Sequence, residues 1–488
     1  MLGAPKATPT EENTADHGRY NQELKRTLGP AQIFAISFAF ISVAVGVFGT
    51  YDDVLRNAGP VGIWLWVIPS VGQTLVALVI AQFAARISLA GSCYSWASRL
   101  ATPKIGWGFG WISFCYLAVG VVAVDNGLAS MALMPVLGLE PNEDVARIIT
   151  IAVLLIQAVL AITSTRIVGF LNGCAVGVEI SIIAVLVVAL TIAVMFTGLG
   201  STANLTTRGI TANASNYWGV GGGLSIAMIM GLGTLVGFDA AANLSEEAKE
   251  PYRNVPRAIV GSVIAAAVLG LLFLIALTVA IPDVPRLSND PSPVATILRE
   301  QLGHVVEVAL MTAITFAFFA CGMVTMATGA RLIYAMSRDS RFPAHQLMRR
   351  VSPRTQTPVP ATLLLLAGGI VLMLVLPGDA LYQLITASTI LPILLYMATV
   401  ALYLGVRGKL GRQEGAFDLG RFESPIAIIA LIWLVFALFV LVTPNAALVP
   451  AMIVLGLMVV GGLFFLSILV FNREALDSLP EAQPVVKH

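Results

Sequence analysis

The sequence has 488 residues, of which 57% are hydrophobic and 11% are charged, with a mean hydropathy of +0.88 and a net charge of +1. Because soluble domains usually carry about 25% charged residues, this composition excludes a water-soluble globule and indicates a protein that spans a membrane. The near-zero net charge argues against nucleic acid as a partner. The four cysteines show no metal-ligand spacing, so we expect no metal ion and no cofactor.

Twelve apolar segments follow one another along the chain, between a polar tail at 1–27 and another at 472–488. Each segment is close to the ~20 residues that a helix needs to cross the hydrocarbon core of a bilayer. They lie near residues 30–51, 61–86, 107–136, 148–165, 172–198, 221–245, 257–281, 304–336, 359–377, 381–405, 424–443 and 447–471. The expected fold class is therefore an all-α polytopic membrane protein with twelve transmembrane helices, surrounded by lipid.

The distribution of positive charge predicts how these helices are oriented. An even number of spans places both termini on one side, and lysines and arginines concentrate in the tails and loops of that side. The opposite side carries Arg56, Arg147, Arg208, Arg286 and Arg299. Because positively charged loops stay in the cytoplasm, we expect both termini to be cytoplasmic, in the cell (plasma or inner) membrane.

Two segments contain residues that weaken a helix. The first, FAFISVAVGVFGTY, contains Gly46 and Gly49, and the sixth carries three glycines before Asp239 in GLGTLVGFDAAANLSEEAKEPYRNVPRAI. The two segments are five apart, so they occupy equivalent positions in two five-helix halves, and the odd number of spans inverts one half relative to the other. Paired breaks in inverted repeats are typical of the binding site of a secondary transporter. The alternative for either segment is that glycine only permits close helix packing.

Three stretches of the sequence read as long composite signatures. They are GPVGIWLWVIPSVGQTLVALVIAQFAARISLAGSCYSWASRL, GFDAAANLSEEAKEPYRNVPRAI and GARLIYAMSRDSRFPAHQLMRRVSPRTQTPVPA. In order and spacing they resemble segment 2 with its following loop, the segment 6–7 region and the segment 8–9 region of the amino acid–polyamine–organocation superfamily of permeases. The resemblance is closest to its branch of amino acid and choline transporters, which includes GABA and choline permeases.

The resemblance implies a leucine-transporter-like fold, in which two inverted five-helix repeats are followed by two peripheral helices. On this chain the first repeat would occupy residues 28–198, the second repeat residues 221–405, and the two peripheral helices residues 424–471.

The resemblance also places the substrate at the breaks in segments 1 and 6. In segment 1, Ala44, Val45 and Gly46 stand where the family usually has Gly-Ser-Gly, so one glycine remains and the middle hydroxyl is missing; Ser42 offers a hydroxyl nearby. The half-helix that starts there would present free N–H groups to a substrate carboxylate.

In segment 6, backbone carbonyls around the break would accept hydrogen bonds from a substrate ammonium. Gly233 stands at the position of the family's aromatic gate, which leaves Phe238 as the nearest replacement. The residues expected to form the substrate site are therefore Ser42, Ala44, Val45, Gly46, Asp125, Gly233, Thr234, Leu235, Val236, Gly237 and Phe238.

Three acids lie within the apolar segments: Asp125 in segment 3, Glu179 in segment 5 and Asp239 in segment 6. Ionisable groups inside a membrane are usually functional or paired, although each of these could also be a structural anchor. Asp239 stands at the family's acid position, where a carboxylate can bind a cation or carry a proton. We expect Asp239 and Glu179 to act in coupling and gating.

The charged run SEEAKEPYRNVPR follows segment 6 and is either a solvated cytoplasmic loop or a set of charges with specific partners in the protein. The resemblance implies that Glu246 and Glu247 form a cytoplasmic latch with the arginines near Arg331 and Arg338, which would gate access.

The function expected is a permease that moves an amino acid or a related small amine or zwitterion by alternating access, with a proton as the preferred coupling ion. Sodium coupling or exchange, a choline or polyamine substrate, and a non-transporting nutrient sensor remain alternatives. No catalytic residue is expected, because no histidine lies mid-span and the two acid motifs do not resemble those of intramembrane proteases. A channel is disfavoured, since the sequence shows neither a pore loop nor charge rings. The sequence does not predict an oligomeric state.

Overall fold

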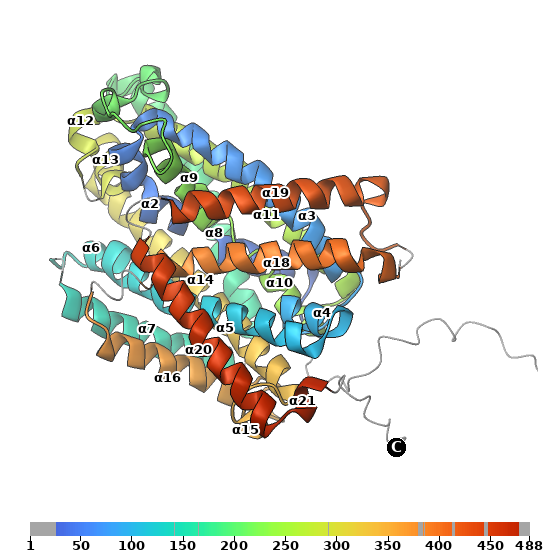
Figure 1. Ribbon diagram of the computed structural model, residues 1–488. Helices are drawn as coiled ribbons and strands as arrows, with labels where there is room; N and C mark the ends of the chain where they lie inside the picture. The colour runs from blue at the N-terminus through green and yellow to red at the C-terminus, as the bar shows by residue number, and fades with distance from the viewer. Residues whose placement is uncertain are drawn as a thin grey trace, which may run out of the picture.

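The computed structural model describes residues 26–140, 142–163, 165–290, 292–378, 384, 386–411, 415–443 and 448–477. This part of the chain is almost entirely helical, which confirms the expected all-α fold (Figure 1). The predicted tails lie mostly outside the described residues.

Among the described residues, the twelve apolar segments of the sequence reappear as ten helices long and apolar enough to cross a membrane, together with two shorter apolar helices. The first five segments are α1 (Pro30–Ile41) with α2 (Val43–Asn57), η1 (Pro60–Trp66) with α3 (Val67–Ala84), α5 (Pro103–Gly127) with η2 (Leu128–Leu133) and α6 (Met134–Val136), α7 (Glu143–Thr163), and α8 (Thr165–Thr197). The other seven are α9 (Gly223–Thr234) with α10 (Ala240–Asn243), α11 (Pro251–Val279), α14 (His304–Arg338), α16 (Val359–Val375), α18 (Ile390–Val406), α19 (Glu423–Val442) and α20 (Leu448–Phe471).

Short elements connect these helices. They are α4 (Ser92–Leu100), η3 (Thr202–Leu205), η4 (Gly209–Thr211), η5 (Ser245–Glu247), α12 (Val284–Leu287), α13 (Pro293–Leu302), α15 (His345–Met348), η6 (Arg407–Lys409), η7 (Gly420–Phe422) and α21 (Glu474–Asp477).

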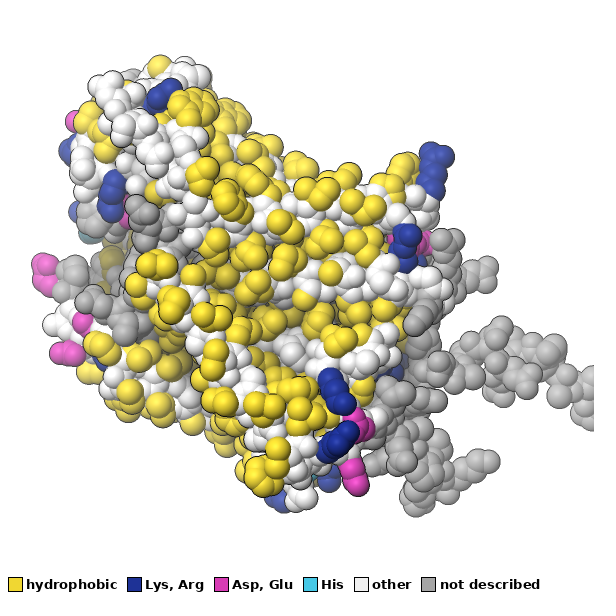
Figure 2. All heavy atoms as spheres, viewed as in Figure 1, with side chains coloured by type: hydrophobic (Ala, Val, Ile, Leu, Met, Phe, Trp, Pro, Cys, Tyr) yellow, Lys and Arg dark blue, Asp and Glu magenta, His cyan; other side chains and the backbone are white. Residues whose placement is uncertain are grey.

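The surface matches a protein held in lipid. Figure 2 shows hydrophobic side chains across the middle of the visible face, while Lys, Arg, Asp and Glu gather at its two ends. Helix α20 is the extreme case, because only 11% of its most apolar window is buried inside the protein. A helix so apolar and so exposed needs lipid as its solvent.

Helices distant in the sequence pack together at the centre. Helix α1 packs against α8, α11 and α14, while α2 packs against α9 and α14 packs against α5. The two interrupted segments therefore lie in the interior, where non-helical backbone is surrounded by protein. The division into repeats at 28–198 and 221–405 stays a prediction.

The break in segment 1 lies at Ser42, four residues before the glycine around which the sequence placed it. Ser42 has a φ of +36° and separates α1 from α2. Gly46 and Gly49 lie inside α2. A Cβ on Gly46 would overlap the Thr234 side chain of α9. Gly46 thus permits close helix packing, the alternative that the sequence left open, and it is Ser42 that interrupts the helix.

The break in segment 6 lies where the sequence placed it. Helix α9 ends at Thr234, and α10 starts again at Ala240. Gly237 lies between them with a φ of +80°, and a Cβ there would overlap the Phe40 ring of α1. Glycine is needed at this position both for its backbone conformation and for this contact.

The start of the predicted C-terminal tail is ordered and packed. The Arg341 guanidinium, itself 1% exposed, donates a hydrogen bond from Nε to the Ala475 carbonyl at 2.8 Å, and Lys104 pairs with Asp477 at 2.8 Å. Leu476 is 1% exposed. Residues 472–477 therefore belong to the folded protein.

Candidate functional site

The helices on both sides of the break in segment 1 contact segment 6 at its break. Ser37 of α1 donates a hydrogen bond from Oγ to the Phe238 carbonyl at 2.8 Å, across 201 residues of sequence. Gly46 meets Thr234, and Gly237 meets Phe40, at the close approaches described above. Because a broken helix exposes backbone groups that need partners, the Ser37 hydroxyl helps to satisfy the break in segment 6.

The start of α2 is occupied by a carboxylate of the chain itself. Glu179 of α8 accepts hydrogen bonds at Oε1 from the Ala44 amide and from the Ser42 hydroxyl, both at 3.0 Å. The Val45 amide points to Ser42 Oγ at 3.4 Å. A helix N-terminus attracts negative charge, so this is a favourable place for a carboxylate. The sequence expected free N–H groups for a substrate here; in this conformation Glu179 uses one of them.

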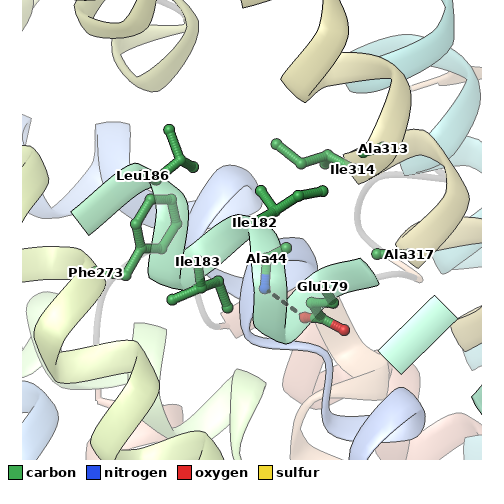
Figure 3. Close-up of a pocket in the computed structure, with 9 residues that line it drawn as sticks. All are labelled: Ala44, Glu179, Ile182, Ile183, Leu186, Phe273, Ala313, Ile314 and Ala317. Atoms are coloured by element: carbon green, nitrogen blue, oxygen red, sulfur yellow. Dashed lines mark hydrogen bonds between the residues drawn. The ribbon is translucent and has the colours of Figure 1, made fainter. Parts of the chain in front are cut away.

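A small cavity lies beside Glu179. Figure 3 shows Glu179 bonded to the backbone of Ala44 at one side of this cavity, with aliphatic and aromatic side chains of α8, α11 and α14 around the rest. The lining residues are Ala44, Glu179, Ile182, Ile183, Leu186, Phe273, Ala313, Ile314 and Ala317. Its volume is about 10 Å³, and its walls are apolar, so it holds no substrate as it stands.

Asp239 anchors the break in segment 6 through neutral donors. Tyr396 of α18 donates to Asp239 Oδ1 at 2.7 Å, while the Ser92 hydroxyl and the Asn243 amide donate to Oδ2 at 3.3 and 3.5 Å. Tyr396 also accepts a hydrogen bond from the Gly237 amide at 2.8 Å. One tyrosine thus fixes both the unwound backbone and the acid that follows it.

Phe238 packs on the same tyrosine. Its ring is fully buried and stacks on Tyr396, with the ring centroids 4.8 Å apart. Sequence reasoning missed Tyr396 and Ser92, since nothing in their local sequence distinguishes them from other polar residues at helix ends and in apolar helices.

A second cavity, which we call the Asp239 cavity, opens beside that carboxylate. Its lining residues are Phe40, Ser92, Ser113, Tyr116, Leu117, Asp239, Ala240, Asn243, Thr328 and Leu395. They come from segments 1, 3, 6, 8 and 10 and from α4. Its volume is about 10 Å³, close to that of one water molecule.

Asp125 is not among the residues that line these two cavities. Its Oδ1 accepts a hydrogen bond from Gln157 Nε2 at 2.7 Å, and the same amide nitrogen donates to the Phe319 carbonyl at 3.1 Å. A Cβ on Gly322 would overlap this pair. The structure thus places Asp125 in a packed contact among α5, α7 and α14.

Buried ion pairs close one end of the molecule. Arg331 Nε lies 2.8 Å from Glu247 Oε1, with side-chain exposures of 0% and 1%, and Arg338 pairs with Glu246 at 3.1 Å. Glu246 Oε1 also accepts a hydrogen bond from the Ala90 amide at 2.9 Å. The structure forms the pairs that the resemblance implied; their gating role stays a prediction. We call this the Glu247 end.

The opposite end contains a larger cavity of about 370 Å³. Its lining includes charged residues of both signs from α2, α13 and α14, namely Asp52, Asp53, Arg56, Arg299 and Glu307. Arg56 lies 3.6 Å from Asp52, and Arg299 pairs with Glu307 at 2.7 Å. We call this the Arg299 end.

Comparison with known proteins identifies the family of this chain. The sequence profile described as "Amino acid permease" matches residues 28–465, which is most of the protein. The chain belongs to the amino acid permease family.

Individual relatives agree with this assignment. The chain is 26% identical over 445 residues to the amino-acid permease BAT1 of Arabidopsis thaliana, with 85% of each protein covered. It is 26% identical over 459 residues to the GABA-specific permease of Saccharomyces cerevisiae, covering 90% of this chain and 79% of the relative. The BAT1 homolog of Oryza sativa is likewise 26% identical over 450 residues, with 85% of this chain and 84% of the relative covered.

The family membership and the apolar helices establish a multi-pass membrane transporter and confirm that the protein is not an enzyme.

Proposed function

We propose that this protein is a secondary active transporter that imports an amino acid or a related small amine by alternating access, driven by a proton gradient. The relatives named for amino acid and GABA transport support this class of substrate. Half-helix termini and unwound backbone are the groups that transporters of this architecture present to small charged substrates.

The observation that carries the proposal is the contact of the broken segment 1 with the break in segment 6. Ser37 of α1 bonds Phe238 in the break, and the unwound residues of segment 6 are buried from Leu235 to Asp239. Interrupted backbone is costly inside a membrane, so two interrupted segments packed on each other favour a binding function over a purely structural one. The substrate region is therefore proposed between Ala44 and the break in segment 6.

Of the two acids expected to act in coupling, Glu179 and Asp239, Glu179 is the better candidate to carry the coupling proton. Its carboxylate bridges α8 to the start of α2, and no cation pairs with it among the described residues. The charged form is stabilised by the N-terminus of α2, whereas the protonated form loses most of that attraction. Protonation would thus loosen the contact between α8 and the break, linking proton binding to movement of α2.

The surroundings of the break in segment 1 favour a proton over sodium. A segment 8 side chain that bonds the backbone just before the break is Cys321, whose thiol donates to the Phe40 carbonyl at 3.3 Å. Sodium binds hard oxygen ligands, and a thiol is a poor substitute for them. Thr325, one turn further along α14, donates its hydroxyl to the Cys321 carbonyl of its own helix.

The test is uptake of radiolabelled substrate into proteoliposomes, after a thermal-shift screen over amino acids, GABA, ethanolamine, choline and polyamines. We expect uptake by the parent protein to follow an imposed pH gradient and to be independent of sodium. Glu179→Gln should still bind and exchange substrate but should no longer accumulate it, because the amide cannot titrate. Binding without exchange or uptake by the parent would show a sensor instead of a transporter.

Asp239→Asn provides the matched comparison for Glu179→Gln. If Asp239 contacts the substrate, its amide variant should lose binding, whereas Glu179→Gln should lose only accumulation. The reverse pattern would assign the coupling proton to Asp239.

A further inference from the structure

A polar pair is buried where α5, α7 and α14 meet. The amide nitrogen of Gln157 donates to Asp125 Oδ1 at 2.7 Å and to the Phe319 carbonyl at 3.1 Å. The side chains of Asp125 and Gln157 are both 0% exposed. Because an amide nitrogen has two N–H donors, these two acceptors use all that it offers.

The other oxygen of each partner has no hydrogen-bond partner among the described residues. These two oxygens are Asp125 Oδ2 and Gln157 Oε1, and both are buried. Turning the amide over would not help, because its oxygen would then face the Phe319 carbonyl, and neither of those oxygens is a donor. Two buried acceptors without a donor are costly, so the pair requires a donor that this arrangement of its atoms lacks.

No positive charge compensates Asp125. Among the described residues no Lys, Arg or His pairs with it, and α7 carries no ionisable residue from 148 to 163. Helices α16 and η2 carry none either. On α14 the ionisable group nearest in sequence to the contact is the thiol of Cys321, which lies within electrostatic range of both Asp125 and Glu179 of α8. An ionised Asp125 would therefore be a membrane-buried charge without a counter-ion, which is strongly unfavourable.

A single proton satisfies both unpartnered oxygens. A protonated carboxyl group has one O–H donor and keeps an acceptor oxygen. With the proton on Asp125 Oδ2, the O–H group donates to Gln157 Oε1 while Oδ1 continues to accept from Nε2. The acid and the amide are then joined by two hydrogen bonds of opposite direction, and the pair carries no net charge.

We propose that Asp125 is a proton-binding site, protonated in this conformation and held by Gln157 as a positioning residue. This proton is distinct from the coupling proton assigned to Glu179, and its binding does not depend on the transported substrate. Asp125 lines none of the three cavities described above, so none of them brings water to the proton. The proton therefore stays on Asp125 while α5, α7 and α14 remain packed together.

Two features of the backbone fit such a site. A Cβ on Gly322 would overlap Asp125 and Gln157, so glycine leaves room on α14 for the pair. Shortly after Asp125, segment 3 continues as the π-helix η2, where the Leu128 amide is shared between the carbonyls of Val124 and Asp125. Single π-helical turns inside membrane or soluble helices occur frequently at functional sites.

A metal ion or a water molecule fits the two oxygens less well. Hard cations such as magnesium and calcium take six or more oxygen ligands, whereas this pair offers two free acceptors. The described residues also contain no group of three His, Cys, Asp or Glu side chains that could hold a metal ion. A water molecule could donate to both oxygens, but it would leave the charge of an ionised Asp125 uncompensated.

The first experiment detects the proton by infrared spectroscopy of the purified full-length protein. A protonated carboxyl group has a C=O stretching band apart from those of carboxylates and amides, and an aspartate in water is ionised above about pH 4. At neutral pH the parent should show such a band, and Asp125→Asn should remove it. Glu179→Gln and Asp239→Asn are the matched acid-to-amide controls, and both should keep the component that Asp125→Asn removes.

Gln157→Leu gives a second assignment of the same band. This variant removes both hydrogen bonds to the carboxyl group, so the band should remain but move to higher frequency, as expected for a C=O group without a donor. A band that is unchanged in Gln157→Leu would show that Gln157 does not position the proton, which overturns the pair.

The second experiment measures proton binding through stability. Above about pH 4 the unfolded chain releases the proton of Asp125 whereas the folded protein keeps it, so the folded state loses stability relative to the unfolded state as the pH rises. From about pH 5 to about pH 8, the equilibrium constant for unfolding should therefore rise about 10-fold more per pH unit in the parent than in Asp125→Asn. Reversible unfolding in mixed detergent micelles measures both slopes.

The remaining outcomes overturn the site without affecting the proposed transport function. If Asp125→Asn removes no protonated-carboxyl band and its pH slope equals that of the parent, Asp125 is ionised. If NaCl or KCl raises the thermal midpoint of the parent but not that of Asp125→Asn, the pair binds a monovalent cation instead of a proton. Neither result involves substrate uptake, and a failure of uptake to follow a pH gradient would leave the proton on Asp125 in place.

Discussion

The two ends of the molecule hold their charged side chains in opposite ways. At the Glu247 end, Arg331 and Glu247 are almost fully buried and join α14 to the segment after the break in segment 6. At the Arg299 end, charged residues line a cavity of about 370 Å³, and the Arg299 side chain is 62% exposed. The difference indicates a conformation that is sealed at the Glu247 end and hollow at the Arg299 end, as one state of an alternating-access cycle would be.

The backbone adds to the seal at the Glu247 end. The amides of Thr27 and Leu28 both donate to the Glu247 carbonyl at 3.0 Å, and the Lys249 amide donates to the Leu28 carbonyl at 2.9 Å. Opening this end therefore requires the start of segment 1 and the segment after α10 to separate. The Arg299 end needs no comparable rupture.

The largest expected effect is on chemical accessibility. In a Cys174→Ser background, Ala295→Cys places a thiol in the cavity at the Arg299 end, and Ser113→Cys places one in the Asp239 cavity. A membrane-impermeant thiol reagent should label the first variant rapidly from the Arg299 side, and it should label the second only slowly from the Glu247 side, because that end opens only in the other state of the cycle. Labelling of the second variant from the Glu247 side as fast as labelling of the first from the Arg299 side would contradict a sealed Glu247 end. The remaining cysteines, Cys93, Cys115 and Cys321, are buried.

The next effect is the cost of breaking the buried pair. Arg331→Met should lower the free energy of unfolding by about 3–5 kcal/mol, because it leaves the Glu247 carboxylate buried without its partner. Thermal unfolding of the purified protein measures the change. Replacing both partners, Arg331→Met with Glu247→Leu, should restore much of the stability. A single variant as stable as the parent would show that the pair does not hold this end closed.

The corresponding change at the other end should be small. Arg299→Gln removes a pair in which the arginine is mostly exposed, and such pairs contribute little to stability. Its thermal midpoint should stay close to that of the parent in the same assay. A loss as large as that of Arg331→Met would mean that the two ends are equally sealed.

The smallest effect concerns the ordered C-terminal residues at the Glu247 end. The hydrogen bond from Lys104 holds the pKa of Asp477 below its usual value. A lowered pKa means that the stabilisation is present at neutral pH and is lost as the pH falls below about 4. The protection of the amides of residues 472–477 against hydrogen exchange, measured relative to the intrinsic exchange rate at each pH, should therefore decrease at low pH. In Asp477→Asn this decrease should be absent; an unchanged pH response would point to another acid.

Much of the fold follows from local properties of the sequence. Twelve apolar stretches of membrane-spanning length predict the helices, because lipid imposes the same length requirement wherever a segment lies in the chain. The break in segment 6 was also predictable from local sequence, because its glycines mark a place where the helix can unwind. Gly237 there adopts a backbone conformation that few other residues tolerate. The pairing of Glu246 and Glu247 with Arg331 and Arg338 came from the family resemblance.

The tertiary structure alone decided the details of the site. Segment 1 breaks at Ser42, where Glu179, 137 residues away in the sequence, accepts hydrogen bonds from the Ser42 hydroxyl and the Ala44 amide. The nearby glycines therefore predicted the wrong position for this break. Asp125 and Asp239 are both acids within apolar segments, yet packing places Asp125 against Gln157 and Asp239 at a cavity. Hydrogen-bond partners of buried acids depend on which helices meet, and helix packing is a property of the whole chain. The sequence therefore determined which segments cross the membrane and where one of them unwinds, while the tertiary structure determined which side chains face the break.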